Sequence, residues 1–357
     1  PNALTIASYL KKNGYRTISN GKISHFAKDA AYGWDDMFRS PRSNPKDYKD
    51  PLNIKNLKNN FGPASEFIYA DDNDYSDGKV TQKTLQDIQS INKNDKPYFI
   101  AVGFQKPHLP FIAPKKYWDL YDRNDISLPY NNFFPPSAPK KANYFYEIRK
   151  FTDIPDEGPI TESKAKELIH AYYACVSYID AQIGLILDEL DNQDLTDNTT
   201  IILTSDHGFS LSEHGRWTKH NLFQYELKIP MIISSPKYKK NKTSESFVEL
   251  VDLYPTFCEI AGLEIPSFAQ GKSLINNLKK PKKITNDIAF SRWQNGETLI
   301  SNKYYYTEWR RKGNLTHRML YDIENDELQM NNIAEIKSKK SIVDSLSRIL
   351  NLSLIHI

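Results

Sequence analysis

The stretch Thr199-Thr200-Ile201-Ile202-Leu203-Thr204-Ser205-Asp206-His207-Gly208 decides the fold class of this chain. Its first six residues are apolar or β-branched and predict a strand. Residues 205–208 follow at the carboxyl end of that strand, which is where ligands bind in open α/β sheets. Taken alone, Asp206 is better explained as the cap of a turn than as a metal ligand. The function therefore depends on the rest of the chain.

Alternating helices and strands before this stretch predict an α/β fold. Residues 4–12 have the spacing of a short amphipathic helix that Gly14 ends, and residues 15–19 follow as a strand. A second step joins a helix over residues 80–91 to a strand over residues 98–104. The nearly continuous apolar run of that strand favours burial on both faces.

The remaining elements predict a mixed sheet between helix layers, followed by a smaller antiparallel sheet with a helix. A long helix begins near Thr161, a strand spans residues 229–234, and Asp252 is expected to cap a helix that stops at Gly262. The linker Lys279-Lys280-Pro281-Lys282-Lys283 precedes short strands and a final helix, over residues 288–293, 298–301, 304–309, 318–321 and 337–350.

This order predicts a catalytic domain over residues 1–278 and an α+β subdomain over residues 279–351. In residues 26–73 and 117–159 the apolar residues show neither the regular spacing of a helix nor that of a strand. These two segments are either substrate loops or elements that the pattern does not reveal.

Composition excludes several classes of protein. The 357 residues are 39% hydrophobic and carry a net charge of only +3, so we expect neither a disordered chain nor a nucleic-acid partner. No apolar run reaches the length of a membrane span, so we expect no membrane segment. Cys175 and Cys258 lie in apolar helical patterns and are expected to be buried thiols.

Both ends of the sequence look unlike natural termini. Residues 1–4 have neither a start methionine nor a signal-peptide profile, so we expect the chain to begin inside a gene. Residues 352–357 match a reading frame of a sequencing adapter and are expected to be a non-native tail.

Two basic clusters follow the first two strands. Lys22 and His25 come directly after the strand over residues 15–19, and His108 follows the strand over residues 98–104. Alone, a Lys-x-x-His sequence is weak evidence, and a histidine between prolines is often a surface residue. The flanking prolines nevertheless restrict the backbone, which suits a histidine held in one orientation for proton transfer.

A third cluster follows the strand that ends at Thr204. Asp206 and His207 are followed by Glu213-His214-Gly215 and by Trp217-Thr218-Lys219-His220. Such a density of ionisable groups favours a functional loop. Ionisable residues thus follow three different strands. A fold can bring such distant segments together to form an anion-binding site. The predicted centre has a cation held by carboxylates, lysines that neutralise an oxyanion, and histidines for proton transfer. Sulfate and phosphate esters are equal candidates as substrates.

The segments that carry these groups resemble the type I sulfatases of the alkaline-phosphatase-like superfamily, most closely the iduronate-2-sulfatase branch. The resemblance covers nearly the whole chain and rests on residues 14–17 with Gly21, Lys22 and His25, and on residues 99–111, 204–219, 251–256 and 320–326.

The resemblance implies a role for each site residue. Asp206 and His207 become ligands of one calcium ion, together with two aspartates of an early strand that this sequence does not contain. Lys22 and Lys219 become catalytic and substrate-binding residues that hold the sulfate oxygens. His25 would contact the hydroxyl group of a formylglycine hydrate and act as a base, and His108 would serve the sulfate and the leaving group.

The nucleophile implied by the resemblance is formylglycine, made by a maturation enzyme from Cys or Ser in a Cys/Ser-x-Pro-Ser-Arg motif. The chain contains no such motif, and neither Cys175 nor Cys258 fits it. We therefore expect the 357-residue chain to be inactive alone and to bind calcium weakly.

The implied substrate is a sulfated sugar or polysaccharide, which Trp217, His214 and the irregular loops would select. The resemblance also implies export to a periplasm, a lysosome or the cell exterior. A phosphodiesterase or phosphonate monoester hydrolase of the same superfamily is the nearest alternative. A non-catalytic anion-binding homologue, which would keep Lys22, His108 and Lys219, is the other.

Overall fold

The computed structural model describes residues 4–26, 28–42, 44, 46–92, 96–144 and 146–354. The chain forms two compact units, each built from segments distant in the sequence. Unit 1 consists of Pro1–Leu128 and Ile148–Thr199, and unit 2 of Pro129–Glu147 and Thr200–Ile357. The expected domains 1–278 and 279–351 follow the sequence rather than this division and stay a prediction.

The sheet of unit 1 has strand β1 (Arg16–Gly21) between β2 (Asp36–Phe38) and β4 (Tyr98–Gly103), all parallel. Helix α1 (Ile6–Lys12) precedes β1. The hydroxyl oxygen of Thr5 caps α1 by accepting from the amide of Ser8 at 3.2 Å. Gly14 then turns the chain into β1 with a φ of +90°. The expected helix, glycine and strand are confirmed.

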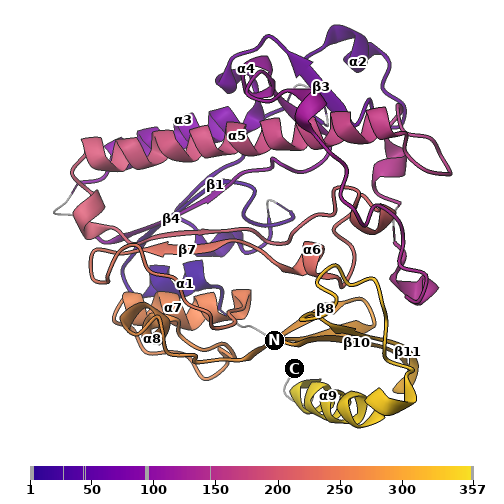
Figure 1. Cartoon of the computed structure of the whole chain (residues 1–357). Helices are drawn as coiled ribbons and strands as arrows, with labels where there is room; N and C mark the ends of the chain where they lie inside the picture. The colour runs from indigo at the N-terminus through magenta and orange to yellow at the C-terminus, as the bar shows by residue number, and fades with distance from the viewer. Residues whose placement is uncertain are drawn as a thin grey trace. The chain divides into compact units, whose positions relative to one another are not determined.

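Two helices cover one face of this sheet. Helix α3 (Ser76–Gln89) and the 31-residue helix α5 (Glu162–Asn192) lie side by side, while α1 lies on the opposite face of the β1–β4 pair (Figure 1). Both α3 and α5 contribute buried residues to the packed interior of unit 1. The other elements of unit 1 are α2 (Pro51–Lys55), the parallel strands β3 (Ser65–Ile68) and β5 (Phe111–Pro114), and α4 (Lys115–Trp118).

The expected double burial of the strand at residues 98–104 is wrong. Every residue of β4 is only partly buried, whereas Thr17 to Gly21 of β1 are buried. Within the described part of the chain β4 pairs with β1 alone, so it is an edge strand. An apolar run therefore does not distinguish a central strand from an edge strand here.

The second segment of unit 2 begins with β6 (Ile201–Thr204), which pairs antiparallel with β7 (Met231–Ser234) and not with β1 or β4. The helices that follow are α6 (Gln224–Leu227), α7 (Leu253–Ile260) and α8 (Ile275–Lys279). Asp252 occupies the N-cap position of α7 as expected, but its side chain does not cap the helix. The carboxylate accepts instead from the amides of Glu249 at 2.9 Å and Lys272 at 2.8 Å.

The carboxyl-terminal sheet of unit 2 has four antiparallel strands in the order β11-β10-β9-β8. They are β8 (Ile288–Trp293), β9 (Gly296–Ser301), β10 (Tyr304–Arg311) and β11 (Asn314–Asp322). Helix α9 (Lys340–Leu354) packs against this sheet through Val343 and Leu350, which meet Leu299, Tyr306 and Leu320. The expected sheet and helix are confirmed. Residues 355–357 of the expected tail lie outside the described residues.

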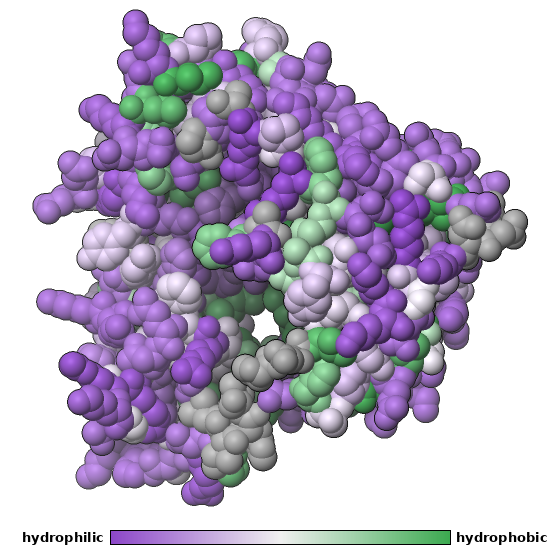
Figure 2. Space-filling view, turned by 180° about the vertical axis from the view of Figure 1, so that it is seen from behind, coloured by the Kyte–Doolittle hydropathy of each residue, from purple (hydrophilic) through white to green (hydrophobic). Residues whose placement is uncertain are grey.

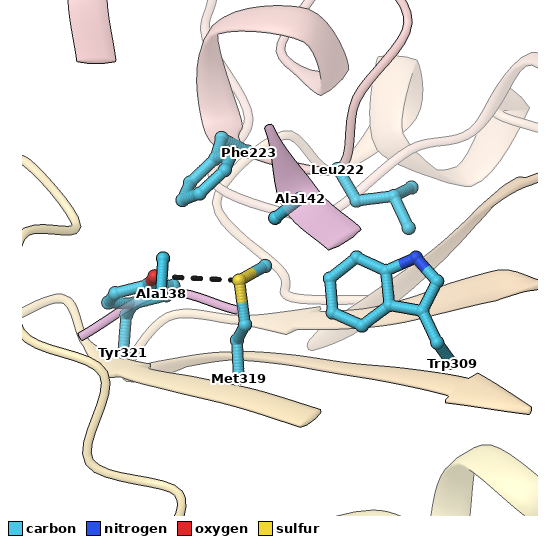
Figure 3. Packing of buried hydrophobic residues seen from close by; sticks show 7 residues of the cluster. All are labelled: Ala138, Ala142, Leu222, Phe223, Trp309, Met319 and Tyr321. Atoms are coloured by element: carbon cyan, nitrogen blue, oxygen red, sulfur yellow. Dashed lines mark hydrogen bonds between the residues drawn. The ribbon is translucent and has the colours of Figure 1, made fainter. Parts of the chain in front are cut away.

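A second apolar cluster fixes the loop after β6 to this sheet. Figure 3 shows its residues packed together, namely Ala138, Ala142, Leu222, Phe223, Trp309, Met319 and Tyr321. The Tyr321 hydroxyl donates to the Met319 sulfur at 3.5 Å. Burial of this apolar surface anchors Leu222 and Phe223, shortly after Lys219 and His220, to β10 and β11.

The α/β fold class is confirmed, with parallel sheets, helices and a small antiparallel sheet. The strands of the described residues form four separate sheets rather than one continuous mixed sheet. The face in Figure 2 is mostly hydrophilic, with apolar side chains in small groups. Among the described residues, no helix is both long and apolar enough to span a membrane.

Candidate active site

The first half of the candidate site lies where β1 and β4 end. A Cβ atom on Gly21 would lie 2.1 Å from the carbonyl oxygen of Gly103, and one on Gly103 would lie 2.2 Å from that of Lys22. Only glycine allows this approach, and the amide of Lys22 donates to the Gly103 oxygen at 2.7 Å. Lys22 and the segment after Gly103 therefore leave the sheet at the same edge, as expected.

His108 is held in one orientation by its own loop. Its Nδ1 lies 2.6 Å from the carbonyl oxygen of Leu109. A carbonyl oxygen only accepts, so Nδ1 carries the proton and the neutral ring keeps its lone pair on Nε2. The backbone amide of His108 also donates to Gln105 at 2.9 Å. Nε2 is therefore the ring nitrogen that carries the lone pair, and the proton-transfer role expected of His108 stays a prediction.

Sequence reasoning missed the groups that hold this loop. Asp77, in the first turn of α3, accepts from the amides of Gln105 and Lys106 at 2.9 Å each. The Lys106 ammonium donates to the carbonyls of His108 at 2.9 Å and Pro110 at 2.6 Å. Burial raises the pKa of Asp77 and lowers the pKa of Lys106. The only sequence signal was an acidic residue in a helical first turn.

His25 lies on an exposed loop of the same unit. Its ring meets Phe26 edge-on, with 4.7 Å between the centroids. Arg39, directly after β2, donates to the carbonyl of His25 at 3.4 Å and to the carbonyl of Ser24. Lys22, His25 and His108 thus all lie in unit 1, beyond the ends of neighbouring parallel strands.

Asp206 and His207 lie in unit 2, directly beyond β6. The Asp206 side chain is 71% exposed, and its Oδ1 is 3.6 Å from Nε2 of His207. His207 Nδ1 lies 2.7 Å from the carbonyl oxygen of Gly208, so in the neutral ring the lone pair again sits on Nε2. This arrangement, with one ring nitrogen tied to a carbonyl, is typical of metal-binding histidines.

These two residues do not complete a calcium site. Calcium takes six to eight oxygen ligands in proteins. Among the residues that the structure describes, no group of three or more His, Cys, Asp or Glu side chains is placed to hold a metal. Asp206 and His207 fit one edge of such a site.

Lys219 is paired with a partner that sequence reasoning missed. Its ammonium forms an ion pair with the carboxylate of Glu147, and the two side chains are only 14% and 16% exposed. The other oxygen of Glu147 lies 3.7 Å from Nδ1 of His220. Glu147 lies in the irregular stretch over residues 117–159, where no pattern pointed to it.

Some of the ionisable side chains after β6, whose density favoured a functional loop, are instead part of the buried core of unit 2. Arg216 is fully buried, pairs with Glu226 at 3.2 Å and lies 4.4 Å above the ring of Phe223. His214 is also buried, and desolvation together with the Arg216 charge lowers its pKa to about 4. Arg216 thus contacts both Glu226 and, at 3.3 Å, Nδ1 of His214 inside unit 2.

Trp217 does not suit its expected contact with a sugar. Its side chain is only 3% exposed. His214 does not suit a contact with a sugar either, because it is fully buried and its Nε2 lies 2.8 Å from the Leu328 carbonyl oxygen. Aromatic residues with this degree of burial stabilise the core of unit 2 instead.

Residues 2–263 match the sulfatase family, and residues 212–354 match the carboxyl-terminal family of N-sulphoglucosamine sulphohydrolase. The chain therefore belongs to the sulfatase family. It is 32% identical over 310 residues to iduronate 2-sulfatase of Mus musculus, covering 74% of this chain and 55% of that protein. The chain spans only 55–61% of the length of the first curated relatives that it matches.

Two solved structures show the same fold. One is a protein in complex with its substrate D-glucosamine-2-N,6-O-disulfate, with a TM-score of 0.78, 20% identity, and coverage of 99% of this chain and 82% of that one. The other is a phosphonate monoester hydrolase from Silicibacter pomeroyi, with a TM-score of 0.79, 19% identity, and coverage of 100% and 81%. Both confirm the alkaline-phosphatase-like fold.

Proposed function

We propose that this chain contributes the anion-binding and proton-transfer groups of an enzyme that hydrolyses sulfate esters on a sugar or polysaccharide. The observation that carries the proposal is the edge of the β1–β4 pair, where Lys22 and an oriented His108 leave the sheet together. The ammonium group of a lysine binds sulfate oxygens, and a histidine whose lone pair lies on Nε2 can accept a proton there.

In this proposal Lys22 and Lys219 bind the sulfate oxygens and stabilise the charge of the transferring group. Nε2 of His108 serves the leaving oxygen, which must gain a proton as the ester bond breaks. His25 acts as a base. Formylglycine, when present, supplies the nucleophilic oxygen, and calcium supplies a positive charge beside the group that is transferred. Asp206 and His207 would be two of the calcium ligands.

A sulfated uronic acid is the favoured substrate class because the relative from Mus musculus is an iduronate 2-sulfatase. The glucosamine disulfate in the complex above supports a sulfated sugar more broadly. We further propose that the protein is exported and that a formylglycine-generating enzyme is its maturation partner. Neither proposal depends on the geometry of the site.

The test uses protein expressed from its complete gene together with a formylglycine-generating enzyme. Hydrolysis of an aryl sulfate and of a phenyl phosphonate monoester is compared by kcat/KM. We expect the sulfate ester to be preferred and Lys22→Met to lower kcat/KM by about 100-fold, because one charged donor to the transferring group is lost. A preference for the phosphonate would favour a phosphonate monoester hydrolase, and inactivity on both esters a non-catalytic anion-binding homologue.

A further inference from the structure

A pocket in unit 2 contains chemistry that the proposed mechanism does not use. Its walls include the rings of Tyr144, His220 and Trp293, and its polar lining residues include Lys141, Asn143 and Gln294. The hollow measures about 390 Å³ including its open mouth. From this pocket we propose a second binding site in unit 2 that holds an anionic sugar ring of the substrate.

The aromatic wall is ordered by its own contacts. The rings of His220 and Trp293 are stacked, with 4.6 Å between centroids and 26° between planes. Tyr144 meets His220 edge-on at 5.3 Å. These contacts hold the rings in place without a ligand. An ordered aromatic surface binds a flat apolar face, and the C–H face of a pyranose ring is such a face.

The polar lining residues indicate the charge of the ligand. Asn143 and Gln294 each offer amide donors and acceptors that suit sugar hydroxyl groups. Lys141 is exposed and adds a positive charge, and the described residues that line the pocket include no carboxylate. A uronate or a sulfated hexose matches this lining, whereas a cationic ligand would be repelled by Lys141.

The pocket adjoins the proposed sulfate-binding lysine. His220 directly follows Lys219, and Glu147 contacts both the Lys219 ammonium and, at 3.7 Å, Nδ1 of His220. The inference rests on the proposed function in one respect, because it assigns this ring to the same sulfated substrate. Binding of a sugar can still be measured without any hydrolysis.

The test is titration of the 357-residue chain with a heparin-derived disaccharide that carries a 2-O-sulfated uronate, followed by calorimetry and tryptophan fluorescence. Its unsulfated counterpart separates recognition of the carboxylate from that of the sulfate, and lactose is the neutral probe. We expect Trp293→Ala to weaken binding about tenfold and Lys141→Gln about fivefold. Lys140→Gln, which changes a neighbouring exposed lysine outside the pocket, should have no effect.

Circular dichroism checks the fold of each variant, and Trp293→Phe repeats the test if Trp293→Ala does not fold. Equal affinity in the wild type, Trp293→Phe and Lys141→Gln would overturn the inference, as would the absence of saturable binding. Sugar binding by this chain, combined with a failure of the protein expressed from its complete gene to hydrolyse any sulfate ester, would overturn the proposed function alone. If sulfate esters are hydrolysed but sugar binding is insensitive to both substitutions, only the proposed second binding site would be overturned.

Discussion

The ammonium of Lys219 is paired with the carboxylate of Glu147, a residue 72 positions earlier in the chain. Both side chains are more than four-fifths buried, so solvent screens their attraction only partly. In the proposed function Lys219 binds sulfate oxygens. An incoming sulfate must therefore compete with Glu147 for the same ammonium group.

The first prediction concerns this competition. Glu147→Gln should raise the affinity of the chain for inorganic sulfate by roughly fivefold, because the neutral amide no longer neutralises Lys219. Calorimetric titration with sulfate measures the change. The matched control is Glu157→Gln, at an exposed site. Unchanged or weaker binding in Glu147→Gln would show that Glu147 does not compete with the anion.

The second prediction concerns the edge that presents Lys22. Gly103→Ala should destabilise unit 1 by about 3 kcal/mol, because the new Cβ would lie 2.2 Å from the Lys22 carbonyl oxygen. Gly184→Ala is the control, since nothing lies within 4 Å of a Cβ at this position inside α5. It should stabilise by about 0.5–1 kcal/mol. Urea unfolding measures both, and equal stabilities would contradict the close approach.

The third prediction concerns the buried pair of Arg216 and Glu226. Arg216→Met should lower the free energy of unfolding by about 3–5 kcal/mol, because it leaves the Glu226 carboxylate buried without its counter-charge. Adding Glu226→Leu should recover part of that loss. Urea unfolding measures both variants. If Arg216→Met alone is as stable as the wild type, the pair has no structural role.

The fourth prediction follows from the buried His214. Desolvation and the Arg216 charge lower its pKa from 6.5 to about 4 in the folded state. Between these values the unfolded chain binds a proton and the folded chain does not, so stability is full above the unfolded pKa and falls as the pH approaches 4. The contribution lost between pH 7.5 and pH 5 is about 2 kcal/mol.

The measurement for His214 is urea unfolding at the two pH values, in the wild type and in His214→Gln. The amide of Gln can still donate to Leu328, but it does not titrate, so the pH dependence of its unfolding free energy should be smaller by that amount. Identical slopes in the two proteins would show that His214 does not carry this dependence.

Local patterns predicted the regular elements well. The strand over residues 288–293 coincides with β8, and the apolar stripe after Thr161 became the long helix α5. Both depend on side-chain periodicity within one segment, which the sequence displays directly. The basic groups after β1 and β4 were also predictable, because parallel strands end at one edge of a sheet.

Long-range pairing was not predictable in the same way. β4 proved to be an edge strand, and β6 pairs with β7 rather than with the β1–β4 sheet. Glu147, which pairs with Lys219, lies far away in a stretch without a pattern. Burial of Trp217 and His214 is likewise a property of packing, and a polar loop sequence alone does not reveal it.

The most direct test of the central claim is whether Lys22 and Lys219, which lie in different units, bind the same sulfate ion. Calorimetric titration with inorganic sulfate is performed on the wild type, Lys22→Met, Lys219→Met and the double variant, with Lys28→Met and Lys237→Met as exposed controls. The proposed function predicts that each lysine weakens binding when replaced, with a coupling of about 1 kcal/mol or more in the double-mutant cycle. Strictly additive effects, or controls as damaging as the two lysines, would contradict it.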